Sequence, residues 1–337
     1  MIIDAHAHLV APPQLNAHRT NLIVAQGQYG YPYRAEVSDA QLAAAAQNNV
    51  DIMDNVGTDV QLLSPRPFTL LHGKANWQDI VAWTMDNNDL IARTIKMHPT
   101  RFRGVAAIPQ KVGAPVTDSF DEIDRCINEL GFVGILLNPD PSEGTNESPP
   151  MGDPYWYPLY EKMIELDCPI HVHSCNCCNG RESYDEHFIN EESLAITSLY
   201  KAAIFKRYPD LKIMISHGGG AIPYQIGRWR SHYQMFGKPR MYDNQGPELF
   251  DDILKQFWFD TVLHDKNALE HLFKTVGADR CVFGTERPGS GGGIDPLTGR
   301  PYDDLKPVIE GIAGLTPDEK TGLFEGNARK LFSRLDL

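Results

Sequence analysis

Short apolar runs alternate with amphipathic stretches along most of the chain. Short runs rich in β-branched residues are typical of buried strands, and an apolar repeat near 3.6 is typical of helices. The predicted strands cover residues 2–3, 59–63, 102–108, 133–137, 169–173, 212–216, 256–260 and 280–284. The predicted helices cover residues 41–56, 79–97, 119–130, 156–166, 191–208, 221–235, 267–276 and 316–331. This alternation predicts an α/β fold, a (β/α)8 TIM barrel in a single domain over residues 1–337, with a doubly wound open sheet as the alternative.

Three long stretches show no clear period. Residues 9–38, 141–153 and 174–190 are rich in turn-forming or polar residues such as Pro, Gly, Ser and Asn. Loops of this length within a compact domain usually form lids or binding surfaces. We expect them to lie over the C-terminal mouth of the barrel.

Polar side chains gather where the predicted strands end. They are His6, His8, Arg66, Asn138, His173, His217, Asp260 and Glu286. In a barrel the C-terminal ends of all strands meet in one mouth, where catalytic residues collect. In an open sheet the same residues would be spread along an edge. The pattern therefore favours the barrel.

His6 and His8 are the strongest candidates for metal ligands. Alternate side chains of an extended segment point to the same side, so both imidazoles can reach one point. His173 and Glu286 would complete three nitrogens and one carboxylate, a set that suits Zn²⁺, with Mn²⁺ as an alternative. His171 shares a face with His173 and is the competing ligand.

Other polar residues are candidates for catalysis and substrate binding. His217 precedes three glycines, and we favour a general base over a metal ligand or a buried structural histidine. Asp260 could orient a neighbouring group or cap its strand. Arg66, Arg228 and Arg230 could bind carboxylates, although Arg230 could equally be an exposed helix charge.

Composition narrows the classes of partner. The formal net charge of −13 argues against nucleic acid and anionic membranes, but a few local arginines could still bind a small anion. No apolar run is long enough to span a bilayer, and no cleavable signal is evident, so we expect a cytoplasmic enzyme with reduced cysteines. Cys175, Cys177 and Cys178 lack the second cysteine pair of a zinc finger. One of these thiols could still lie near a catalytic centre.

Taken in order, several motifs resemble the metal-dependent amidohydrolase superfamily over essentially the whole chain. They lie at residues 3–8, 64–66, 128–132, 137–140, 217–224, 283–286, 293–296 and 324–329. The resemblance is to the branch that contains aminocarboxymuconate semialdehyde decarboxylase, and within it to the 4-oxalomesaconate hydratases. Decarboxylases of this branch usually carry Asp after the eighth strand, where this chain carries Glu286. An arginine of the hydratase pattern, shortly before residues 293–296, is missing, and Arg287 lies earlier in the same loop.

The resemblance implies roles for individual residues. The implied zinc ligands are His6, His8, His173 and Glu286. The implied catalytic residues are His217, Glu286 and Cys178. The resemblance also places Cys178, with Asn179 or Asn190, near the substrate. Together with the candidates already given, the predicted substrate-binding residues are Arg66, Asn138, Asn179, Asn190 and Arg228.

The resemblance also implies a reaction. We expect a hydro-lyase that adds zinc-activated water across the C=C bond of an unsaturated oxo-polycarboxylate such as 4-oxalomesaconate. The substrate would be a small di- or tricarboxylate from aromatic acid catabolism through meta-cleavage of protocatechuate or gallate. The alternatives are a non-oxidative decarboxylase of a hydroxylated aromatic acid or semialdehyde, and a hydrolase of a lactone or amide. A homo-oligomer, dimeric or larger, is also expected.

Overall fold

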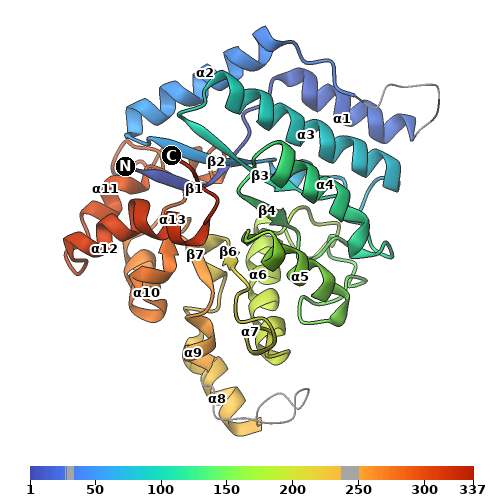
Figure 1. Ribbon diagram of the computed structural model, residues 1–337. Helices are drawn as coiled ribbons and strands as arrows, with labels where there is room; N and C mark the ends of the chain where they lie inside the picture. Colours follow the sequence, from blue (N-terminus) through green and yellow to red (C-terminus); the bar gives the residue numbers. More distant parts are fainter. Residues whose placement is uncertain (27, 29–33, 237–249) are drawn as a thin grey trace.

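Eight parallel strands form one sheet whose order follows the chain from β1 to β8. In the computed structural model they lie in the middle of the molecule with helices around them (Figure 1). The structure describes residues 1–26, 28, 34–236 and 250–337. The ring closes where Ala5 N donates to the Phe283 carbonyl at 2.8 Å and Glu286 N donates to the His6 carbonyl at 2.7 Å. The predicted (β/α)8 barrel is confirmed.

The strands are short and buried, as the apolar runs predict. They are β1 (Ile3–His8), β2 (Val60–Ser64), β3 (Phe102–Ala107), β4 (Gly134–Leu137), β5 (Ile170–Val172), β6 (Ile213–Ile215), β7 (Trp258–Asp260) and β8 (Cys281–Val282). The first strand is longer than predicted and includes both histidines of the His-x-His pair. The two imidazoles are therefore carried by one regular strand.

The helices alternate with the strands along the chain. The α-helices are α1 (Pro13–Ala25), α2 (Asp39–Val56), α3 (Trp77–Met97), α4 (Phe120–Asp124), α5 (Tyr157–Glu165), α6 (Tyr184–Lys201), α7 (Ile204–Arg207), α8 (Ile226–Phe236), α9 (Phe250–Leu254), α10 (Lys266–Val276), α11 (Leu305–Glu310), α12 (Pro317–Thr321) and α13 (Asn327–Leu331). Short 3-10 turns precede or follow several of them, including η1 (Pro67–Thr69) after β2 and η5 (His217–Gly219) after β6. Two π-helical turns, η3 (Arg125–Glu129) and η8 (Gly322–Gly326), continue α4 and α12.

Local capping explains where two of the long helices begin. Ser38 Oγ accepts from Gln41 N at 3.3 Å while the Gln41 side chain accepts from Ser38 N, which is a capping box that starts α2. Ser183 and Glu186 form the same reciprocal pair before α6. The predicted helix start near Ser38 is therefore confirmed.

The prediction of an unstructured segment over residues 9–38 is wrong for α1. This helix begins with Pro13 at its first turn and buries Leu15, His18 and Leu22. Its alternating apolar and polar positions give only a weak amphipathic pattern, so packing against α3 rather than local sequence defines it. Residues 27 and 29–33 of the same stretch lie outside the described residues.

Other boundaries also differ from the prediction. Helix α6 begins at Tyr184, so the loop expected over residues 174–190 is shorter by about two turns of helix. Helix α8 begins at Ile226 rather than at residue 221, because the glycine turn after β6 continues through Pro223. Helices α9 and α11 follow apolar patterns too short to be recognised.

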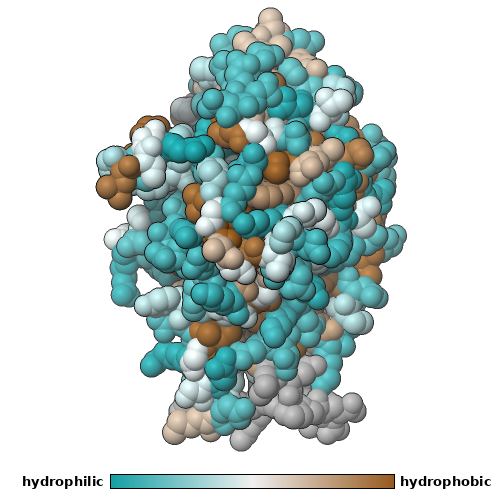
Figure 2. All heavy atoms as spheres, turned by 90° about the vertical axis from the view of Figure 1, so that its left-hand side faces the viewer, coloured by the Kyte–Doolittle hydropathy of each residue, from teal (hydrophilic) through white to brown (hydrophobic). Residues whose placement is uncertain are grey.

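The surface agrees with the charged composition. The face in Figure 2 is mostly hydrophilic, with hydrophobic residues scattered singly or in small groups. In the part of the chain that the structure describes, none of the helices combines the length and the apolar character needed to cross a membrane.

Candidate metal centre and active site

Three buried imidazoles, those of His6, His8 and His173, meet at the C-terminal ends of β1 and β5. Their ring centroids lie 5.0 to 5.6 Å apart. Each ring is held through Nδ1, and each Nε2 is buried without a hydrogen-bond partner. The Nδ1 partners are Asp260 Oδ2 for His6 at 2.6 Å, Ser64 Oγ for His8 at 2.9 Å and the Ser174 carbonyl for His173 at 2.5 Å. Three orphaned nitrogens facing one another are the arrangement that a metal ion satisfies.

Glu286 adds a carboxylate to these nitrogens. Its Oε1 lies 3.6 Å from His173 Nε2, and the four potential ligand atoms of His6, His8, His173 and Glu286 lie within 4.8 Å of one another. Gly284 allows the chain after β8 to lie close to His6, because a Cβ at this position would lie 2.9 Å from His6 Cβ. The cluster therefore has the donor set and the spacing to hold a divalent metal ion.

The protonation states fit this use. Burial lowers the pKa of His6 and, more strongly, the pKa of His8, which keeps the imidazoles neutral as metal ligands must be. Burial opposes the charge of Glu286, but the adjacent imidazoles of His173 and His217 hold the pKa of this carboxyl well below its usual range. The site thus combines the neutral imidazoles of His6 and His8 with an ionised carboxylate.

The structure separates His173 from its competitor His171. His171 Nε2 lies 2.8 Å from Ser216 Oγ, and its ring groups with His6 and Asp260 instead of with Glu286. Only His173 of the two lies in the four-residue cluster. The geometry therefore favours the ligand set that the sequence analysis preferred.

His217 lies beside the cluster between two carboxylates. Its Nδ1 lies 2.8 Å from Glu192 Oε1, its Nε2 lies 3.4 Å from Glu286 Oε1, and its ring stacks on Phe188. Burial opposes a charge on the ring, but Glu192 and Glu286 outweigh it and raise the pKa of His217 well above its ordinary value. His217 is thus held as a protonated imidazolium, a potential proton donor.

Sequence reasoning missed Glu192. This fully buried residue lies on α6, 25 positions before His217, within a helical pattern that contains several acidic residues. Its burial on the inner face of α6 is visible only in the folded chain.

Asp260 both orients His6 and caps the end of β7. Besides binding His6 Nδ1, it accepts from Gly218 N at 3.0 Å and from Val262 N at 3.1 Å. Burial opposes its ionisation, but the hydrogen bond from His6 lowers the pKa of Asp260. An ionised Asp260 fixes the tautomer of His6 so that Nε2 faces the cluster.

Arg66 is the one predicted arginine that the structure brings to the cluster. It follows β2, stacks over the Phe68 ring at 4.7 Å, and lines a small cavity of about 40 Å³ together with His8 and Glu286. Arg228 is exposed on α8, and its proposed role stays a prediction. Arg230 pairs with Asp251 at 2.6 Å, as an exposed helix charge would.

Asn138 and Asn190 lie in different environments. Asn138 is buried, its Nδ2 lies 3.2 Å from His72 Nδ1, and its Oδ1 accepts from Asp140 N. Asn190 is exposed on α6. The recorded hydrogen bonds of Asn138 organise the loop after β4, and substrate contacts of both residues stay predictions.

Cys178 and Asn179 lie in the loop after β5. The Cys178 thiol is 3.5 Å from Glu143 Oε2, and Asn179 Oδ1 accepts from Arg181 N at 3.0 Å. Partial burial and the charge of Glu143 raise the pKa of Cys178, which disfavours a thiolate. A catalytic role of Cys178 stays a prediction, and the geometry suits a thiol donor better than a nucleophile.

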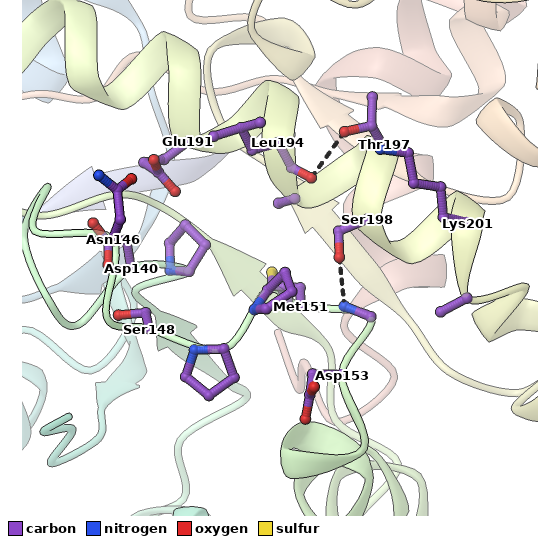
Figure 3. A pocket seen from close by; sticks show the side chains of 16 residues that line it. Asp140, Asn146, Ser148, Met151, Asp153, Glu191, Leu194, Thr197, Ser198 and Lys201 are labelled. Atoms are coloured by element: carbon purple, nitrogen blue, oxygen red, sulfur yellow. Dashed lines mark hydrogen bonds between the residues drawn. The ribbon is translucent and has the colours of Figure 1, made fainter. Parts of the chain in front are cut away.

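A larger cavity, of about 520 Å³, lies between the loop after β4 and helix α6 (Figure 3). Asp140 and Glu191 face each other at one end of it, and Lys201 lies toward the other end. It contains none of the four residues of the metal-ligand cluster. The volume of a cavity therefore does not identify the position of the candidate metal site in this protein.

Known proteins match almost the whole chain. The amidohydrolase family model matches residues 3–334. A 2-keto-4-carboxy-3-hexenedioate hydratase from Sphingobium sp. is 34% identical over an alignment that covers 100% of this chain and 97% of the relative. A 2-amino-3-carboxymuconate-6-semialdehyde decarboxylase from Dictyostelium discoideum is 28% identical and covers 80% of this chain and 71% of the relative.

Solved structures agree with these relatives. A 4-oxalomesaconate hydratase from Rhodopseudomonas palustris superimposes with a TM-score of 0.88 at 35% identity and covers 100% of this chain and 97% of the other. A 2,6-dihydroxybenzoate decarboxylase from Rhizobium shares the fold, with a TM-score of 0.73 at 22% identity and 98% of each chain covered. The superfamily expected from the motifs is confirmed, and the chain belongs to the amidohydrolase family.

Proposed function

We propose that this protein is a hydro-lyase that adds water across the C=C bond of a small unsaturated oxo-polycarboxylate, such as 4-oxalomesaconate, in the breakdown of aromatic acids. The observation that carries the proposal is the cluster of three orphaned imidazole nitrogens and Glu286, with His217 beside it between Glu192 and Glu286. Two hydratases that match this chain over its full length, at 34% and 35% identity, support the same reaction.

We propose that His6, His8, His173 and Glu286 hold one divalent ion, Zn²⁺ in preference to Mn²⁺. Three imidazole nitrogens and one carboxylate support this choice, because zinc favours such mixed sets at catalytic sites. When bound, the ion supplies a Lewis acid that polarises an oxygen atom and makes water more acidic at neutral pH.

The remaining steps belong to side chains of the chain. Water adds to the carbon β to the substrate carbonyl, so one O–H bond breaks while a C–O bond forms. Glu286 is placed in the cluster to accept the water proton, and His217, whose Nε2 lies 3.4 Å from Glu286 Oε1, is placed to donate a proton to the neighbouring carbon. Arg66 binds a substrate carboxylate and holds the double bond beside the cluster.

Oxygen labelling tests the reaction type. In heavy-oxygen water the product is expected to carry the label in a new hydroxyl group, with no carbon lost. A decarboxylase, the alternative favoured by the relative from Dictyostelium, would release carbon dioxide and incorporate only a solvent hydrogen. A lactone or amide hydrolase would place the label in a carboxylate. Product mass spectrometry separates these outcomes, and the absence of label from a hydroxyl would exclude the hydratase.

Replacing Arg66 by methionine is expected to lower kcat/KM by about tenfold or more. The loss follows because one charge-assisted contact with a substrate carboxylate disappears. Arg228→Met is measured alongside, since the sequence predicts the same role for it. Arg230→Met is the control and should keep wild-type kinetics, because its guanidinium already pairs with Asp251. Unchanged kinetics of Arg66→Met would remove Arg66 from substrate binding.

We also propose a single domain over residues 1–337 that acts in the cytoplasm as a homo-oligomer. The net charge of −13 supports a small-molecule enzyme without nucleic-acid or membrane partners.

A further inference from the structure

The cavity beside the metal-ligand cluster is too small for the proposed substrate. It measures about 40 Å³ and is lined by His8, Arg66, Phe68 and Glu286, among other residues. Sites for small organic ligands usually measure about 300 Å³ or more, and a cavity needs only about 10–15 Å³ to hold one water molecule. A polycarboxylate that reacts at Glu286 must therefore extend into neighbouring space.

A second cavity, of about 410 Å³, adjoins the first. The two share Arg66, Phe68 and Pro288 in their linings. Arg66 stacks on the Phe68 ring at 4.7 Å, and the Phe68 side chain is 42% exposed. The exposed Phe68 ring can change rotamer without repacking a core, so the boundary between the two cavities is easily moved on this side.

The second cavity has the chemistry of an anion site. Arg19 from α1 and Arg66 both line it, together with Asn16, Asn87 and apolar side chains. None of its described lining residues is acidic, although the protein carries a net charge of −13. Arg19 Nε donates to the Thr69 carbonyl at 2.5 Å, and the described residues offer its two Nη atoms no recorded hydrogen-bond partner.

We propose that this second cavity binds the part of the substrate remote from the reacting double bond, and that Arg19 pairs with a carboxylate there. The inference rests on the proposed function and adds to it a subsite for the carboxylate that lies farther along the carbon chain from the reacting double bond. Arg66 stands between the cavities and binds the carboxylate nearer the reaction. Arg19 was not among the residues singled out in the sequence, because it lies in the segment expected to be an irregular loop.

Binding of an unreactive polyanion tests the assignment without turnover. The probe is propane-1,2,3-tricarboxylate, titrated calorimetrically into the metal-loaded wild-type enzyme and into Arg19→Met, with propionate as the monocarboxylate comparison. Arg19→Met is expected to weaken tricarboxylate binding by about tenfold or more, the scale of one lost charge-assisted hydrogen bond, and to leave propionate affinity unchanged. Arg19→Lys should recover part of the loss, because the charge remains without the planar fork.

Three outcomes would overturn the proposal. They are no binding of the tricarboxylate to the wild-type enzyme, equal affinity in wild type and Arg19→Met, and an equal loss for both anions. Metal content and melting temperature of Arg19→Met, with Arg230→Met as the matched surface control, identify a loss caused by misfolding. In that case Thr20→Phe, which fills the cavity from the exposed side of α1, must weaken tricarboxylate binding selectively, or the proposal fails. The labelling experiment tests the hydratase separately, so each proposal can fail alone.

Discussion

Replacing His173 by asparagine is expected to strip the bound metal and to lower kcat by about 10³-fold or more. His173 supplies one of three orphaned nitrogens, and a Lewis acid at such a site contributes several kcal/mol to the transition state, where each 1.36 kcal/mol is about tenfold in rate. Metal analysis of the purified variant, together with single-substrate kinetics, measures both effects. Reconstitution of a chelated wild-type enzyme with Zn²⁺ or Mn²⁺ then identifies which ion restores activity.

His171→Asn is the matched control for this experiment. His171 lies on β5, two residues before His173, at the same end of the barrel, but its Nε2 lies 2.8 Å from Ser216 Oγ. This variant is expected to retain one metal ion per chain. Loss of metal from His171→Asn with retention in His173→Asn would reverse the ligand assignment while keeping the site.

Replacing His217 by asparagine is expected to lower kcat by at least ~100-fold while the metal stays bound. The magnitude is the low end for loss of general acid–base catalysis. In the wild-type protein, His217 lies at the edge of the cluster and is held by Glu192. The asparagine of the variant has no imidazole that could donate a proton. Retained metal with wild-type kcat would exclude His217 from proton transfer.

Glu192→Gln separates positioning from chemistry. The amide keeps a hydrogen-bonding group beside His217 Nδ1 but removes the charge that raises the pKa of His217. If protonated His217 is the acid, activity falls as pH rises through its pKa. Without the Glu192 charge that pKa drops, so the alkaline limb of the kcat/KM profile should shift to lower pH. A profile that does not move would show that the Glu192 charge does not control the catalytic proton.

The barrel could be predicted from the sequence because its signals are local. The alternation of short apolar runs with helical patterns depends on neighbouring residues, and Ser38 and Gln41 mark a helix start within four positions. The weakly amphipathic α1 escaped detection, because its stability comes from packing against α3 and not from its own pattern.

The metal-ligand cluster could be predicted for a related reason. His6 and His8 share a face through the strand period, and the barrel topology places the C-terminal strand ends of His173 and Glu286 at the same mouth. The choice between His171 and His173 could be made only in the folded chain. The two residues are two positions apart and so share a face, and they differ in the groups that their rings contact.

The sequence by itself determined the barrel, the His-x-His pair and the strand ends that carry the polar residues, since a repeating period and a known topology are sufficient for these. Only the tertiary structure decided that Glu192 contacts His217 and that Arg19 shares a cavity with Arg66. Both residues lie on helices. Helices of soluble proteins carry many charged residues, and most of these face solvent. Which charged residue is buried depends on how each helix packs against the barrel. This packing involves residues far apart in the sequence, so the local pattern does not predict it.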